Sequence, residues 1–152
     1  MAGSFSIQVT GIDKLNKKLN SIEDFVKSPA AMMKEIGEST KEGAEKNFDK
    51  KGAEYGTAWA SLKASTIAQK RARRLARPTY PLWGTGKMKG SFKSIPKRSE
   101  VTVKNTASYA IFHQGGTRSI PQRKILDIQA PQVVKITKII QKYMQDILKK
   151  RM

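Results

Sequence analysis

Apolar residues recur at helical spacing in two stretches near the start of the chain. Asp13 can cap a helix in the first stretch. The apolar residues of that helix are Leu15, Leu19, Ile22, Phe25 and Val26. Ser28 and Pro29 open the second stretch as a capping residue followed by proline at the first helical position, which predicts a helix that runs to about Phe48. Its inner side would carry Met32, Met33, Ile36 and Ala44.

The most regular apolar stripe follows Pro131, and lysines occupy the other side of the same stretch. The stripe consists of Val133, Val134, Ile136, Ile139, Ile140, Tyr143, Ile147 and Leu148. We predict a long helix over residues 130–152 that packs on the sheet of the domain. A helix lying on a membrane surface is the alternative, but the stripe contains a single aromatic residue and the segment is too short to act alone.

Alternation of apolar and polar residues predicts short strands elsewhere. Residues 5–9 alternate cleanly, with Phe, Ile and Val at every second position. Lys87–Ile95 alternates less regularly and ends before Pro96, whereas Glu100–Lys104 alternates well. The segment from Asn105 to Gly116 favours either a further strand or a short helix.

These elements together predict one α+β domain spanning residues 1–152. A small antiparallel β-sheet would pack with the N-terminal helices, a short basic helix from about Lys63 to Arg77 and the long C-terminal helix. Residues 1–48 would supply the N-terminal strand and helices, and residues 49–127 the loop, the basic helix and the sheet. A chain of 152 residues can bury a core of this kind without covalent staples.

Features that the sequence lacks exclude several classes of protein. There is no cysteine, so disulfides and thiolate metal sites are ruled out. The first residues do not combine a basic region with an apolar run, as a signal peptide would. No stretch approaches the roughly 20 apolar residues of a membrane span. We therefore expect a protein without membrane contact that is made and kept in a cytoplasm.

The charge is strongly positive and unevenly distributed. The net charge is +18; residues 1–54 hold nine lysines and nine acids, so all of the excess lies in residues 55–152. The densest run of cations supplies the candidates for contact with DNA or an acidic partner: Lys70, Arg71, Arg73, Arg74 and Arg77. Charge alone does not distinguish phosphate, an acidic neighbour or water as the surroundings of this run. Aromatic residues are not interleaved with it, which argues against a dedicated single-strand binder.

No set of residues for catalysis can be assembled from the sequence. His113 is the only histidine, and no Gly-x-Ser-x-Gly elbow is present. A lone histidine without cysteines is also a poor zinc site. Residues 84–87 resemble a phosphate-binding loop, but Pro81 stands where that loop needs glycine and Met88 where it needs serine or threonine. We therefore expect neither an enzyme nor a cofactor.

Four short segments follow one another in the middle of the chain. They are Gly56-x-x-Trp59-x-x-Leu62, Thr85-Gly86-x-Met88, Tyr109-Ala110-x-x-His113-Gln114-x-Gly116 and Pro121-x-Arg123-x-Ile125-Leu126. In this order they resemble the phage virion morphogenesis (tail completion) family. The chain departs from the family pattern at Lys63-Ala64, where a Ser-Pro helix start is usual, and at Lys124, where a second proline is usual.

This resemblance implies a structural protein of the virion, located in the tail or at the head–tail junction and present in the host cytoplasm during assembly. It implies a ring that completes the tail so that it can join a DNA-filled head, with six-fold symmetry by analogy with the tail. The expected partners are copies of the same chain, other tail or connector proteins, and DNA contacted without sequence preference in a lumen. The candidates for subunit contact are Trp59, Trp83, Tyr109, His113 and Arg123.

Two of these candidates carry specific expectations. For Trp59, packing in the core of its own chain is the alternative to an interface role. Arg123 lies in an extended segment and could form a forked contact with a carboxylate. The rival function for the whole chain is a free-standing basic nucleic-acid-binding protein, which would account for the charge but not for the four ordered segments.

Overall fold

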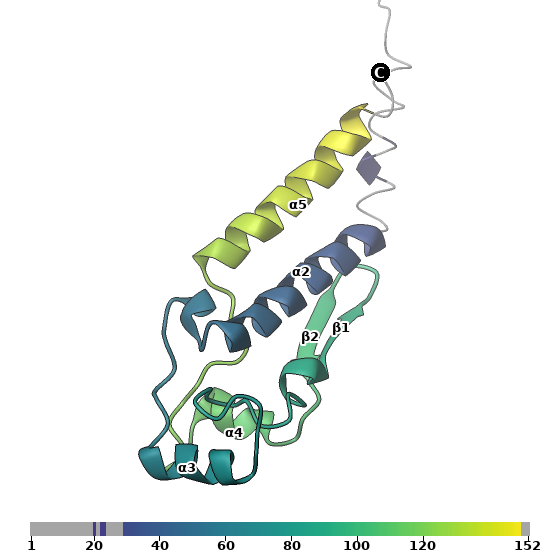
Figure 1. The fold of residues 1–152 in the computed structure, drawn as a ribbon. Coiled ribbons are helices and arrows are strands. Elements are labelled where there is room, and N and C mark those ends of the chain that lie inside the picture. Colours follow the sequence, from purple (N-terminus) through teal and green to yellow (C-terminus); the bar gives the residue numbers. More distant parts are fainter. Residues whose placement is uncertain (1–19, 21, 24–28, 150–152) are drawn as a thin grey trace, which may run out of the picture.

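The structure, a computed structural model, describes residues 20, 22, 23 and 29–149 (Figure 1). The strand predicted at residues 5–9 and most of the helix predicted from Asp13 to Val26 lie outside the described residues. The elements along the described chain are α2 (Ala30–Asp49), η1 (Ala53–Tyr55), α3 (Ala64–Ala72), η2 (Lys89–Ser91), β1 (Phe92–Pro96), β2 (Val101–Asn105), α4 (Ala110–Gly115) and α5 (Ala130–Lys149). Helices combined with an antiparallel sheet make this an α+β fold, as predicted.

Helix α2 is the centre of the fold. On one side it packs against the hairpin of β1 and β2, whose antiparallel register pairs Phe92 with Asn105 and Pro96 with Val101 (Figure 1). The approach is closest at Gly37, where a β-carbon would collide with the side chains of Ser94 and Val101. On its other side α2 packs against α5. The prediction that the C-terminal helix packs on the sheet was therefore wrong, because α2 lies between the two.

Ion pairs support the contact between α2 and α5. The Nζ of Lys142 lies 3.1 Å from a carboxylate oxygen of Glu35. Nearer the start of α5, Lys135 approaches Glu54 at 3.7 Å, and Glu54 also pairs with Lys50 at 2.7 Å. The Lys142 contact holds the pKa of Glu35 below its ordinary value. The lysines of these pairs are exposed, so each pair contributes little stability.

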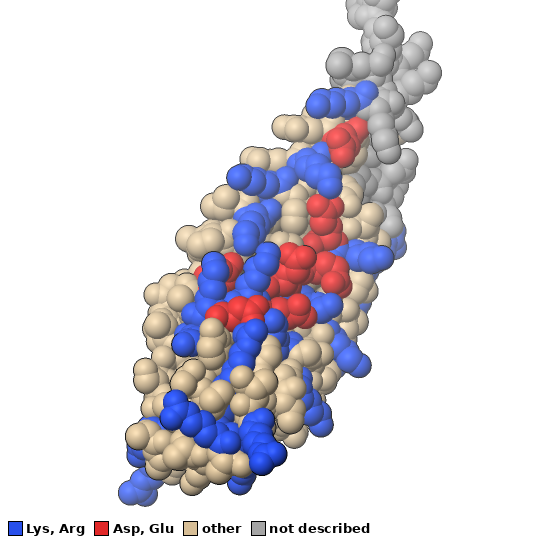
Figure 2. Space-filling model, viewed as in Figure 1, with Lys and Arg blue, Asp and Glu red and all other residues tan. Residues whose placement is uncertain are grey.

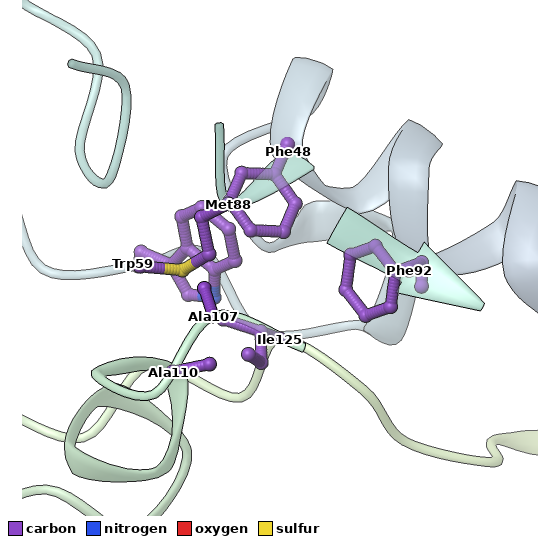
Figure 3. Close-up of a cluster of buried hydrophobic side chains, with 8 residues drawn as sticks. Phe48, Trp59, Met88, Phe92, Ala107, Ala110 and Ile125 are labelled. Carbon is purple, nitrogen blue, oxygen red and sulfur yellow. The ribbon is translucent and has the colours of Figure 1, made fainter. Parts of the chain in front are cut away.

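The main core lies where the C-terminal end of α2 meets the sheet and the loops that follow it (Figure 3). Phe48 is 1% exposed and meets the ring of Trp59 edge to face at a centroid distance of 5.2 Å. Phe92 of β1 approaches the same phenylalanine at 5.9 Å. The remaining buried members are Ala44, Met88, Ala107, Ala110 and Ile125. Residues from five separate segments thus meet around Phe48, which ties the loops on either side of α3 to α2.

Two element boundaries differ from prediction by more than one residue, while Pro29 precedes α2 as its N-cap and β2 is shifted by one residue from the predicted strand. The basic helix ends at Ala72 instead of continuing to Arg77, because Arg73 is its C-cap and Arg74 adopts a left-handed φ of 52°. The strand predicted from Lys87 begins only at Phe92, since the chain forms a 3₁₀ turn over Lys89–Ser91 first. The predicted helix to Phe48, the second strand and the C-terminal helix are all present, and residues 110–115 form the short helix that was one of two alternatives.

Candidate assembly surface

The segment that precedes α5 is irregular in backbone but fixed to the core. The carbonyl oxygen of Lys124 accepts hydrogen bonds from Nδ2 of Asn47 and from Nε1 of Trp59, both at 3.0 Å. Asn47 is fully buried and Trp59 is 7% exposed. Trp59, an interface candidate from the sequence, therefore fills the core of its own chain and positions the segment at Lys124.

Gln114 of α4 fixes the next two residues of the same segment. Its Oε1 accepts hydrogen bonds from the backbone N–H groups of Ile125 (2.8 Å) and Leu126 (3.1 Å), and its Nε2 donates to the carbonyl oxygen of Leu126 (2.7 Å). One side chain thus replaces the strand partner that this extended segment lacks. The Tyr-Ala-x-x-His-Gln segment and the Pro-x-Arg segment of the sequence are adjacent in space for this reason.

Arg123 is a buried cation. It is 7% exposed, its Nη2 donates to the carbonyl oxygen of Ala60 at 3.1 Å, and its backbone N–H donates to the carbonyl oxygen of His113 at 2.7 Å. Its Nε has no hydrogen-bond partner, and no carboxylate of the described chain forms an ion pair with it. Burial lowers the pKa of Arg123, although a guanidinium keeps its proton in proteins. The forked contact with a carboxylate that the sequence suggested is not made within the described chain.

His113 lies beside this cation and is partly buried. Burial lowers the pKa of His113 below its ordinary value of 6.5, and the positive charge of Arg123 lowers it further. Its Nδ1 is buried without a hydrogen-bond partner. The lowered pKa favours the neutral imidazole, and no carboxylate among the described residues forms a hydrogen bond with it of the kind that would orient a general base.

The depressed pKa of His113 predicts a loss of stability in mild acid. Between its lowered folded pKa and the unfolded value of 6.5, the unfolded chain binds more protons, so the free energy of unfolding should fall as the pH drops below about 6.5. The slope from this one group cannot exceed about 1.4 kcal/mol per pH unit. Urea titrations between about pH 5 and pH 7 test this, and His113→Gln should flatten the dependence. If the free energy of unfolding of that variant depended on pH as strongly as that of the wild type, a group other than His113 would be responsible.

The five cations of the basic run differ in their surroundings. Lys70 donates from Nζ to the carbonyl oxygen of Tyr80 at 2.6 Å, and burial lowers the pKa of Lys70. Arg77 lies over the ring of Trp83, 4.3 Å from its centroid, and approaches Asp49 at 3.5 Å. The other three, Arg71, Arg73 and Arg74, are exposed and have no ion pair with a carboxylate of the described chain. The first and last cations of the run therefore contact other side chains or backbone groups of the chain, and the three arginines between them are exposed to solvent.

A pocket of about 480 Å³ opens beside α3. We call it the basic pocket, and the turn around residues 82–88, the C-terminal part of α3 and the His113–Arg123 contact surround it. Six of the candidates from the sequence line it: Lys70, Arg73, Trp83, Tyr109, His113 and Arg123. Trp59, Arg71, Arg74 and Arg77 do not line it. Lys87 does, and sequence analysis missed it because it had been placed in a strand.

The carboxylates lie mostly elsewhere. Figure 2 shows acidic side chains as a band across the middle of the molecule, while the end that carries α3 displays Lys and Arg. Between Tyr55 and Leu126 the only acidic residue is Glu100. Carboxylates of the described chain that form ion pairs with its own cations include Glu35, Glu38, Glu42, Asp49, Glu54, Glu100 and Asp127.

Among the described residues, apolar side chains are exposed on α4 and on α5, and elsewhere at Ile95, Tyr109 and Ile128. On α4, Ile111 is 70% and Phe112 53% exposed, because Ala110 is the residue of this short helix that faces the core. On α5 the exposed apolar residues are Val133, Val134, Ile140 and Leu148. The two surfaces are well separated, since α4 lies near α3 and α5 runs away from that end (Figure 1). Sequence analysis treated Ile111 and Phe112 as part of a strand or helix and did not identify them as a surface.

Within the described residues, no group of three or more His, Cys, Asp or Glu side chains is arranged to hold a metal ion. Among the helices of the same residues, none has the length and apolar character needed to cross a membrane.

Comparison with known proteins adds one finding. The sequence model of the phage virion morphogenesis family matches residues 10–145, a span that contains all four ordered segments, the basic pocket and nearly all of α5. No curated protein and no solved structure matches the chain.

Proposed function

The chain belongs to the phage virion morphogenesis family, and from this premise we propose that it completes the tail or joins the tail to the head as a ring-forming subunit around the DNA passage. Membership makes it a bacteriophage protein with a structural or assembly role. The ring, its place in the virion and its contacts belong to the proposal.

The observation that carries the proposal is the pair of separated apolar surfaces. A ring is built from heterologous contacts, in which one surface of a subunit meets a different surface of the next. The surface of Ile111 and Phe112 on α4 and the exposed stripe of α5 offer two such surfaces on one chain. Large apolar side chains exposed together are typical of contact sites. We propose six copies in the ring, by analogy with tail symmetry.

The distribution of charge fits a place beside DNA or an acidic ring. The end that carries α3 has exposed arginines and almost no acids, so it would attract phosphates through charge without reading sequence. A lumen that lets DNA pass needs contact of this weak, non-specific kind. We also propose that the role is structural and not enzymatic, because His113 has no acid–base partner in the structure.

One observation favours the rival, a free-standing nucleic-acid-binding protein. Arg71, Arg73 and Arg74 are exposed and available to phosphates. A free-standing binder would be a monomer or dimer whose affinity for DNA falls steeply with salt, by about one power of the salt concentration per phosphate contact. A ring that binds DNA poorly at physiological salt excludes it.

Replacing Phe112 by serine tests the ring without disturbing the fold. Because Phe112 is 53% exposed, we expect an unchanged urea midpoint but subunit contacts weakened by about 2 kcal/mol, roughly 30-fold in dissociation constant. Sedimentation of the purified protein across a concentration series measures this. Ile95→Ser is the matched control, since Ile95 is an exposed apolar residue on β1, away from both surfaces. Equal dissociation constants for the wild type and Phe112→Ser would show that α4 does not contribute to the subunit interface.

A further inference from the structure

The basic pocket contains cations that no carboxylate of the described chain neutralises. Lys70, Arg73, Lys87 and Arg123 all line it, and none forms an ion pair there. Elsewhere in the described chain most carboxylates are paired with nearby cations. We propose that the basic pocket binds an acidic segment of a second protein, in which a Glu or Asp side chain stands next to an apolar one.

The buried positive charge of Arg123 favours an anion in the pocket. A buried guanidinium is costly unless it is paired and hydrogen-bonded, and here one carbonyl contact is made while Nε has no partner. Its neighbour His113 is neutral and adds no compensating charge. A carboxylate held in the pocket by Arg73 and Lys87 would offset the charge of Arg123 at short range, where burial limits screening by water.

The apolar walls of the pocket explain why we expect an apolar side chain next to the acidic one in the bound segment. Leu62, Leu82 and Met88 line it together with Trp83. Burying an aliphatic side chain against such walls is favourable by about 1.5–3 kcal/mol. Bare inorganic anions and phosphates would gain nothing from these walls.

The same walls disfavour nucleic acid as the occupant. The phosphates of a duplex lie on a convex surface and would meet exposed Arg71 and Arg74 as readily as the cations of the pocket. Stacking of an unpaired base on Trp83 would compete with the guanidinium of Arg77, which lies 4.3 Å from the centroid of that ring. A protein side chain suits a concave pocket of about 480 Å³ with apolar walls better.

A second copy of the chain is the less suitable protein. Its described carboxylates are largely engaged with its own lysines and arginines, as Asp49 is with Lys89 at 2.8 Å and Glu35 with Lys142 at 3.1 Å. To enter the pocket of a neighbour, such a group would first have to give up its own partner. An acidic segment from a different protein meets no such competition. The inference rests on the proposed function only in taking that protein to be another virion component.

The test compares two double variants of equal charge. The probe is a fluorescein-labelled hexapeptide of alternating glutamate and leucine, capped at both ends, and its binding is followed by fluorescence polarisation. Arg73→Glu combined with Lys87→Glu reverses two cations of the pocket, and Arg71→Glu combined with Arg74→Glu reverses two cations outside it. We expect the first pair to weaken binding about 10-fold or more at physiological salt and the second pair about 3-fold or less. Circular dichroism confirms that both variants are folded.

Four results would overturn the inference. They are no binding of the peptide at millimolar concentration, equal losses in the two double variants, equal binding of a glutamine–leucine peptide, and displacement of the peptide by duplex DNA that is as strong in the Arg71/Arg74 variant as in the wild type. Dissociation of rings by the peptide would assign the pocket to a second copy instead. Sedimentation of the same samples separates the two proposals. A monomer that binds the peptide would support the peptide site and contradict the ring. Rings that do not bind the peptide would support the ring and contradict the peptide site.

Discussion

Replacing Trp59 by alanine is expected to lower the free energy of unfolding by about 3–5 kcal/mol, which is a large share of the roughly 5–15 kcal/mol of a typical domain. Trp59 is 7% exposed and meets Phe48 edge to face at 5.2 Å. Its Nε1 also donates to the carbonyl oxygen of Lys124 at 3.0 Å. The substitution therefore opens a cavity in the main core and releases the segment that precedes α5.

Two matched variants separate these contributions. Trp59→Phe keeps an aromatic ring but loses the hydrogen bond to Lys124, so it should cost less than alanine, with about 1 kcal/mol from the missing donor. Trp83→Ala removes a tryptophan that lines the basic pocket and should cost about 1–2 kcal/mol. Urea denaturation followed by circular dichroism measures all three. If alanine at the two tryptophan positions cost the same, Trp59 would not have the core role assigned to it.

Replacing Gly52 by alanine is the second large effect, with an expected cost of about 3 kcal/mol or more. Gly52 has a φ of 94°, which an L side chain rarely adopts. A β-carbon there would lie 2.5 Å from Cδ1 of Trp59 and 2.6 Å from the carbonyl oxygen of Thr57. Both the backbone strain and the collision would distort the loop that positions Trp59 in the core.

Gly56 supplies the control for Gly52. It stands at the other end of η1 with a φ of 78°, but a β-carbon there meets no atom within 4 Å. Gly56→Ala should therefore cost only the backbone strain, about 1–2 kcal/mol. The difference between the two urea midpoints measures the collision with Trp59. Equal midpoints would mean that the loop relaxes around the new methyl group.

Helical periodicity allowed the long helices to be predicted because each carries its apolar residues along one side. Met32, Ile36 and Ala44 are buried on α2 as their spacing indicated. The stripe of α5 predicted the helix but not its partner, because apolar spacing shows that a side is covered and does not show by what. The end of the basic helix was missed for a different reason: Arg74 adopts a left-handed backbone, and the N–H of Leu75 bonds back to the carbonyl oxygen of Lys70, a helix ending that arginine does not signal.

The sequence identified most residues of the candidate site but did not indicate how they are arranged in space. Motif order singled out Tyr109, His113 and Arg123, the cation run singled out Lys70 and Arg73, and Trp83 was a candidate from the irregular segment between them; the fold brings all six to one pocket. No local signal indicated that Arg123 is buried without a carboxylate, since that depends on Ala60, which lies 63 residues earlier in the chain. Exposure of Phe112 likewise depends on which side of α4 meets the core.

The most direct test of the central claim is the mass of the assembled protein in solution, followed by imaging of the same sample. Sedimentation or light scattering should give a multiple of the 17.0 kDa chain, six by the proposal, and electron microscopy should show closed rings. Assembly that requires a tail partner would be seen when that partner is added. A monomer under all conditions, with and without its tail partners, would contradict the proposal that this chain builds a ring.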